Sequence, residues 1–109
     1  MAAATVFGPA EPAEEWVGPT ALIQELAHAV QDADGALYVP VAVGAERRDH
    51  TWTGWLEFRE IGSTRVLRTN RETTQPNQGA LAYWAAGLQP SYLEGAFGRA
   101  RRPHVVRLP

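Results

Sequence analysis

Hydrophobic and polar positions change their period along the chain, and each change predicts an element. Between Pro19 and Ala33 the apolar residues recur three and four positions apart, which predicts an amphipathic helix. Pro19 suits a first helical position, and Gly35 suits the turn after the last one. The apolar stripe of this predicted helix consists of Leu22, Ile23, Leu26, Ala27 and Val30.

The period becomes two from Ala36 to Val43, which predicts a β-strand. One face of this strand carries Leu37, Val39, Val41 and Val43, and the other carries Ala36, Tyr38, Pro40 and Ala42. Because Pro40 has no backbone N–H to donate to a neighbouring strand, we expect an edge strand.

A β-hairpin is predicted next, with strands Thr51–Ile61 and Thr64–Asn70 around a Gly62-Ser63 turn. A two-residue turn fixes the register and brings two opposite-charge pairs and one apolar pair together. The expected partners are Ile61 with Thr64, Glu60 with Arg65, Phe58 with Leu67, Glu57 with Arg68, and Trp55 with Asn70. This register puts Trp52, Leu56, Phe58 and Leu67 on the core face, opposite Trp55, Glu57, Arg59, Val66 and Arg68.

The polar stretch Arg71–Gln78 precedes a second predicted helix that ends near Leu88. Its stripe is Leu81, Trp84, Ala85 and Leu88, and either Thr74 or Asn77 is expected to cap its first turn. Ser91 and Glu94 fit a capping box for a further helix over residues 91–101. Gly95 and Gly98 weaken that helix, so a strand from Tyr92 to Phe97 stays open as the alternative.

These elements add up to an α+β fold in the order α-β-β-β-α-α. We expect a three-stranded antiparallel β-meander with two or three helices packed on one face. Residues 16–102 form the single predicted domain, because one compact domain suits a chain of 109 residues. Residues 1–15 are predicted to be a disordered or loosely docked tail, and residues 103–109 a C-terminal tail or a short edge strand.

Composition narrows the class of protein. The chain is 45% hydrophobic, contains no Cys, and has no run near the roughly 18 apolar residues of a membrane span. All ten basic residues are Arg, which with abundant Ala, Gly and Pro indicates a GC-rich bacterial genome. The N-terminus lacks the features of a signal peptide, so we expect a cytoplasmic protein.

Charge divides unevenly between the two halves of the chain. Residues 1–60 hold ten acidic residues and three Arg (−7), whereas residues 61–109 hold two acidic residues and seven Arg (+5). Such an asymmetry is typical of a basic binding face or a head-to-tail contact, unless folding mixes the two halves.

No catalytic motif stands out, and the sequence leans against an enzyme. Glu57 and Glu72 are the carboxylates on which an enzyme hypothesis would rest. His28 with Glu25 or Asp32 supplies at most two ligands on one helix face, so no metal site and no cofactor are predicted.

The outer side of the hairpin is the leading candidate for function. We expect it to bind a protein partner or a second copy of the chain, because aromatic residues and Arg are enriched at interfaces. Cover by loops or by the N-terminal tail ranks second, and stacking of nucleic-acid bases third. The expected partner-binding residues are Tyr38, Trp55, Arg59, Val66 and Arg68.

The polar loop gives an alternative function. Helix N-termini attract anions, so an anionic ligand or single-stranded nucleic acid can be held there, assisted by the basic C-terminal tail. The candidate residues are Arg68, Arg71, Thr74 and Asn77.

Three strings in the chain, WTGWLEF, LRTNRETTQPN and YLEGA, resemble motifs of a small bacterial protein family of unknown function. The resemblance spans about residues 36–100. It implies no activity and assigns no role to any residue.

Overall fold

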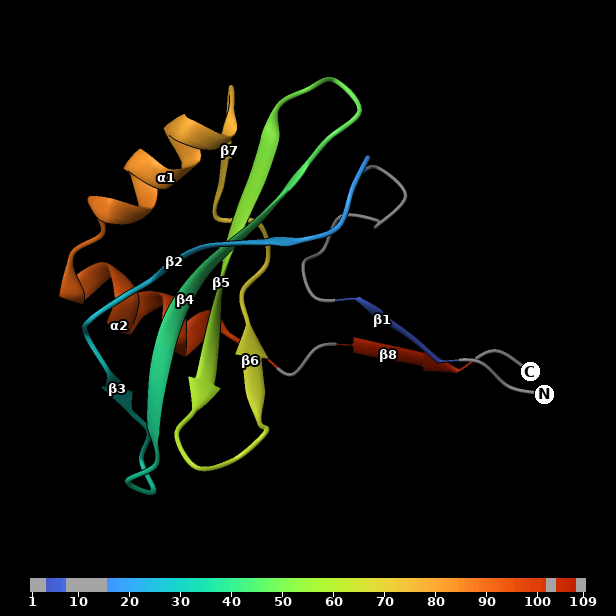
Figure 1. Cartoon of the computed structure of the whole chain (residues 1–109). Coiled ribbons are helices and arrows are strands. Elements are labelled where there is room, and N and C mark those ends of the chain that lie inside the picture. The colour runs from blue at the N-terminus through green and yellow to red at the C-terminus, as the bar shows by residue number, and fades with distance from the viewer. Residues whose placement is uncertain (1–3, 8–15, 102–103, 108–109) are drawn as a thin grey trace.

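The structure is a computed structural model, and it describes residues 4–7, 16–101 and 104–107 (Figure 1). Strands come first and two helices follow them. The elements are β1 (Ala4–Phe7), β2 (Ala21–Glu25), β3 (Val30–Gln31), β4 (Leu37–Glu46), β5 (Trp52–Glu60), β6 (Val66–Arg68), β7 (Thr73–Gln75), α1 (Gln78–Ala86), α2 (Pro90–Arg99) and β8 (His104–Arg107).

The predicted order α-β-β-β-α-α and the three-stranded meander are wrong. Six strands, β2 to β7, form one antiparallel sheet, and all of them precede the helices. Strands β4 and β5 are its centre. Both β2 and β3 pair with the outer side of β4, and both β6 and β7 pair with the outer side of β5.

The largest error is the helix predicted over residues 19–33, which is replaced by β2 and β3. A long strand such as β4 presents a row of backbone groups that needs a partner, and β2 supplies it. A register shift between Leu22 and Gln24, and the break between β2 and β3, turn Ile23, Leu26 and Val30 toward the helices. An interrupted strand thus reproduces the apolar spacing of a helix.

Pro40 lies inside the sheet, so the edge-strand prediction is wrong as well. Its carbonyl accepts a hydrogen bond from the Leu26 N–H at 2.9 Å, directly after β2 ends. The proline nitrogen therefore faces the interruption between β2 and β3, where no ladder hydrogen bond is lost.

The predicted hairpin register is confirmed along β6. Glu57 pairs with Arg68, Phe58 with Leu67 and Arg59 with Val66. Thr69 still lies opposite Leu56: its N–H donates to the Leu56 carbonyl and its Oγ1 accepts the Leu56 N–H, each at 3.0 Å. The register changes after this residue. The predicted pairing of Trp55 with Asn70 does not occur, and β7 resumes the ladder with Thr73 opposite Gly54.

Helix α1 is confirmed, and Asn77 rather than Thr74 caps it by accepting a hydrogen bond from the Ala80 N–H at 2.8 Å. Residues 90–99 form helix α2, so the strand alternative is excluded. The capping box is wrong: Gln89 is the N-cap, and Pro90 takes the first helical position.

Both helices lie on the same side of the sheet (Figure 1), and the main core lies between them and the sheet. Gly44 and Gly54 face each other across β4 and β5 on that side. A Cβ on Gly54 would lie 2.5 Å from a methyl group of Leu81, and a Cβ on Gly44 only 2.4 Å from another. The absence of side chains on Gly44 and Gly54 therefore allows Leu81 of α1 to pack directly against the sheet backbone.

Near the chain ends, β1 and β8 pair antiparallel in a separate two-stranded sheet. Strand β1 lies within the segment predicted as a disordered tail, and β8 within the predicted C-terminal tail or edge strand. Those predictions also depend on residues that lie outside the described part of the chain, namely 1–3, 8–15, 102–103 and 108–109.

Candidate functional site

The sheet face turned away from the helices is the region on which the predicted association site falls, and we call it the outer face. Pairing partners on neighbouring strands share a face, so the register assigns its residues. Along β4 and β5 these are Leu37, Val39, Val41, Val43, Ala45, Thr53, Trp55, Glu57 and Arg59. Strand β6 adds Val66 and Arg68.

One end of the outer face is closed by Trp16. Its indole ring stacks on that of Trp55, with centroids 5.1 Å apart and planes 12° from parallel. Backbone pairing of Trp16 with Arg47 holds it beside the end of β4. Trp55 is only 1% exposed, so it is covered from within the chain, which is the arrangement the sequence ranked second.

The Trp16–Trp55 stack is held by packing rather than by polar contacts. The Nε1 atoms of both rings are buried and have no acceptor among the described residues. A buried donor without a partner costs about 1–3 kcal/mol. Apolar contact with Val41, Val43 and Ala45 must offset that cost.

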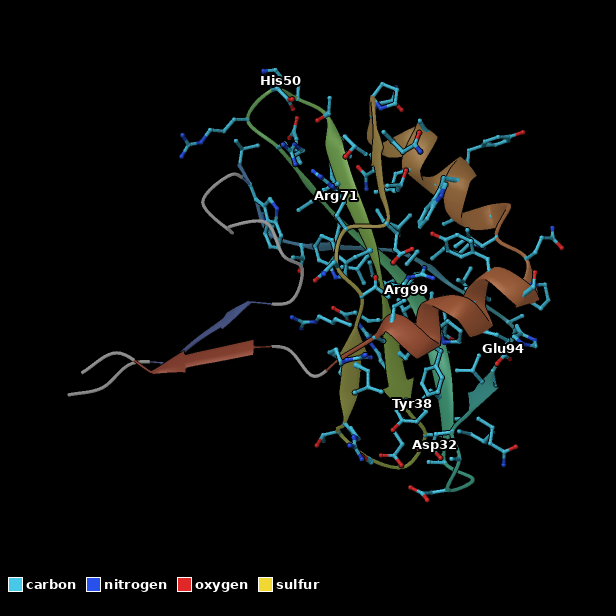
Figure 2. The ribbon with its side chains drawn as sticks, turned by 180° about the vertical axis from the view of Figure 1, so that it is seen from behind. Asp32, Tyr38, His50, Arg71, Glu94 and Arg99 are labelled. Carbon is cyan, nitrogen blue, oxygen red and sulfur yellow. The ribbon has the colours of Figure 1, made fainter. Side chains whose placement is uncertain are left out.

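Tyr38 does not belong to the outer face, contrary to the prediction. It is 1% exposed, lies in the main core, and packs on Phe97 of α2 at 5.1 Å between ring centroids. Figure 2 shows it beneath α2. The alternation of β4 predicts which of its residues share a face, but not which face of β5 they join. That depends on the register between β4 and β5, which the β4–β5 loop does not fix.

The other four predicted residues, Trp55, Arg59, Val66 and Arg68, do share the outer face. Glu57 lies among them and is 6% exposed. Arg59 Nη2 donates to Glu57 Oε1 at 2.9 Å. Arg68 Nε lies 2.9 Å from Glu57 Oε2, and this contact is an ion pair without a hydrogen bond. One carboxylate thus serves two guanidinium groups, which leaves a net charge of +1.

The opposite end of the outer face is open and apolar. Leu37 is 45% exposed and Ile61 57% exposed, beside half-buried Val39 and Val66. Ile61 continues the alternation of β5, because its N–H still bonds to the Leu37 carbonyl at 2.8 Å. Leu22 is also 57% exposed, but it pairs with Val43 and therefore lies at the β2 edge of the end that Trp16 closes.

The residues of the alternative anion site do not converge. Arg68 contacts Glu57 on the outer face, and Thr74 is in β7 opposite Thr53. The side-chain oxygen of Asn77 already accepts the Ala80 N–H at the start of α1. Arg71 is exposed on the connection between β6 and β7 (Figure 2).

The C-terminal arginines that were to assist this anion site have partners too. Arg99 Nη2 donates to Glu72 at 2.7 Å, and Arg101 donates to the carbonyls of Gly98 and Ala100. The side chain of Arg107 and all of Arg102 lie outside what the structure describes. The described side chains of this basic tail are therefore engaged within the chain.

Glu72, Tyr92 and Arg99 form a polar cluster that the sequence did not predict. The Tyr92 hydroxyl donates to Glu72 Oε1, as Arg99 does, and the Arg99 guanidinium lies 5.7 Å from the centroid of the Tyr92 ring. Desolvation, and then the hydrogen bond to Glu72, raise the pKa of Tyr92 to about 12. Tyr92 therefore stays protonated at neutral pH, and the cluster ties α2 to the β6–β7 connection.

The three histidines lie apart. His28 Nε2 contacts Glu94 Oε2 at 3.0 Å, which links the interruption after β2 to α2 (Glu94 is labelled in Figure 2). His50 is in the β4–β5 loop, and His104 is in β8. Within residues 16–101, no three His, Asp or Glu side chains are grouped so that they can hold a metal ion.

Comparison of the chain with protein-family models, with curated proteins and with solved structures found no match. In the part of the chain that the structure describes, neither helix is long and apolar enough to cross a membrane.

Proposed function

We propose that this protein acts by association, as a non-enzymatic interaction or accessory subunit whose outer face is its binding surface. The proposal rests mainly on where exposed apolar side chains gather. Among the described residues five large apolar side chains are exposed, namely Val17, Leu22, Leu37, Ile61 and Tyr83. Two of them, Leu37 and Ile61, lie side by side at the open end of the one sheet face that no helix covers, and Leu22 lies at the β2 edge of the same face.

The composition of the outer face supports binding to protein. Its open end combines aliphatic side chains with Arg59. Aliphatic side chains suit the centre of a protein interface, and Arg suits its rim. Glu57 lowers the positive charge there, which disfavours a phosphate-rich ligand. The engaged positions of Arg68 and Asn77 give the anion-binding alternative less support.

Solution mass and capture from a lysate of the native host test the proposal together. We expect a mass above the 11.9 kDa of one chain, or a captured partner. The double variant Leu37→Asp, Ile61→Asp should lose the association, because each change places a charge on the apolar end. Tyr83→Asp is the matched control, since Tyr83 is exposed on α1. A monomer that captures nothing at micromolar concentration would refute the proposal.

A further inference from the structure

Only the open end of the outer face is accessible, and it is small. The middle of the face and its closed end are buried within the chain. Pairing arranges the accessible side chains in two rows, namely Leu37 beside Ile61, and then Val39, Arg59 and Val66. The rows lie about 7 Å apart and span three strands about 4.8 Å apart. Two folded proteins in a stable complex each bury about 800 Å². The open end is far smaller, so it fits a short segment of a partner rather than a second sheet.

The β6 side of this end carries a net positive charge. Arg101 pairs with Arg68 through an isolated backbone bridge, so it lies at the edge beyond β6. Its guanidinium donates to two backbone carbonyls at the end of α2, which do not cancel its charge. With Arg59, three guanidinium groups gather here, and the carboxylate of Glu57 balances one of them. Three positive charges and one negative charge leave +2.

Negative charge lies on the other side of the sheet. Asp32 and Asp34 are on the turn between β3 and β4 (Asp32 is labelled in Figure 2). Because β3 pairs with β4, both β4 and β5 separate this turn from β6. A segment that carries carboxylates is therefore attracted to the β6 side of the open end and repelled by the β3–β4 turn.

We propose that the open end of the outer face binds a short acidic segment of a partner protein. Its aliphatic side chains cover Leu37 and Ile61, and its carboxylates reach Arg59 and Arg101. Single-stranded nucleic acid fits this end less well, because bases need an aromatic side chain to stack on, and Trp55 is only 1% exposed. The inference rests on the proposed function and gives the chemistry of its partner.

Selection from a random peptide library on the immobilised full-length protein tests that chemistry. We expect the selected peptides to combine Leu, Ile or Val with several Asp or Glu residues. Synthetic copies of these peptides should bind the protein less tightly as the salt concentration rises, because the ion pairs are exposed. Selected peptides that lack acidic residues, or a library that yields no binder, would overturn this inference.

Variants of the protein then locate the site. Ile61→Asp should weaken binding of a selected peptide about tenfold or more, because it places a negative charge against an acidic segment. Arg59→Gln and Arg101→Gln should each weaken it about two- to fivefold, as the loss of an exposed ion pair does. Arg48→Gln is the matched control, since Arg48 is exposed on the β4–β5 loop at the closed end. Circular dichroism checks that each variant stays folded. An equal loss in Arg48→Gln would contradict the proposed position of the carboxylates.

Two other outcomes separate this inference from the proposed function. A wild-type dimer in sedimentation that Ile61→Asp dissociates would overturn the acidic partner segment but leave association through the outer face standing. A labelled single-stranded oligonucleotide that binds more tightly than any selected peptide, and loses affinity in Arg59→Gln but not in Ile61→Asp, would overturn both.

Discussion

Single side chains supply hydrogen bonds where a strand is interrupted and where the helices join the rest of the fold. The Oγ1 of Thr69 accepts the buried Leu56 N–H at the point where β6 gives way to β7. Asn77 does the same for the first turn of α1. Glu72 holds two donors from α2 at once. Because a buried unpaired N–H is costly, Thr69 stabilises the sheet at this interruption, whereas Asn77 and Glu72 stabilise the positions of α1 and α2.

Tyr92 makes the alkaline stability of the fold a test of the Glu72 cluster. Its pKa is raised from 10.0 to about 12, so the folded state favours the protonated phenol. That contribution is complete below pH 10 and is lost as the pH rises toward 12. We expect the free energy of unfolding to fall more steeply over this window in the wild type than in Tyr92→Phe, as measured by urea denaturation.

The exposed Tyr83 supplies the control for that measurement. Tyr83→Phe should keep the steep wild-type slope. Parallel curves for the wild type and Tyr92→Phe would show that the phenol contributes no such pH dependence.

The two helices are held on the sheet by different contacts. Helix α1 rests on the sheet because Gly44 and Gly54 present no side chain beneath Leu81, which is completely buried. Helix α2 is held instead by Leu93 and Ala96 in the core, by the Tyr92 and Arg99 contacts to Glu72, and by the Glu94 contact to His28. The two helices thus cover the same face by different means.

Substitution of Gly54 tests the close contact between Leu81 and the sheet backbone. Gly54→Ala should lower the free energy of unfolding by about 1–3 kcal/mol, because the new methyl group overpacks a site with no free space. Gly98→Ala is the matched control, since no atom lies within 4 Å of the place that its methyl group would take on α2. It should raise stability by up to about 1 kcal/mol. Equal effects of the two changes in chemical denaturation would contradict the close contact.

The whole molecule has two unlike sheet faces. One is filled by the helices, and the other is divided between an end that Trp16 closes and an end that stays open. Trp16 is contributed by a segment that precedes β2 and is joined to β4 by few backbone bonds. Trp16 packs from this segment against the cluster of Val41, Val43, Ala45 and Trp55.

Removal of that side chain should uncover the cluster. Trp16→Ala is expected to cost about 2–4 kcal/mol in urea denaturation and to increase binding of a hydrophobic dye, since Trp55 loses its stacked partner. Trp16→Phe should retain most of the stability, because neither indole N–H has an acceptor among the described residues to lose. An unchanged Trp16→Ala protein would mean that Trp16 is not what stabilises this end.

The sequence alone determined the features that depend on neighbouring residues. The β5–β6 register follows from a short loop, and α1 follows from its apolar stripe and from the polar residues before it, of which Thr74 and Asn77 were both candidate caps. It also separated Trp55 from Phe58, because side chains alternate along any strand. Only the tertiary structure decided that residues 19–33 form β2 and β3 instead of a helix, because the need of β4 for a hydrogen-bonded partner outweighs local helical spacing. Contacts between residues far apart in the sequence also decided three further features. They put Tyr38 on the core face, bring Glu72 to Tyr92 and Arg99, and cover Trp55 with Trp16.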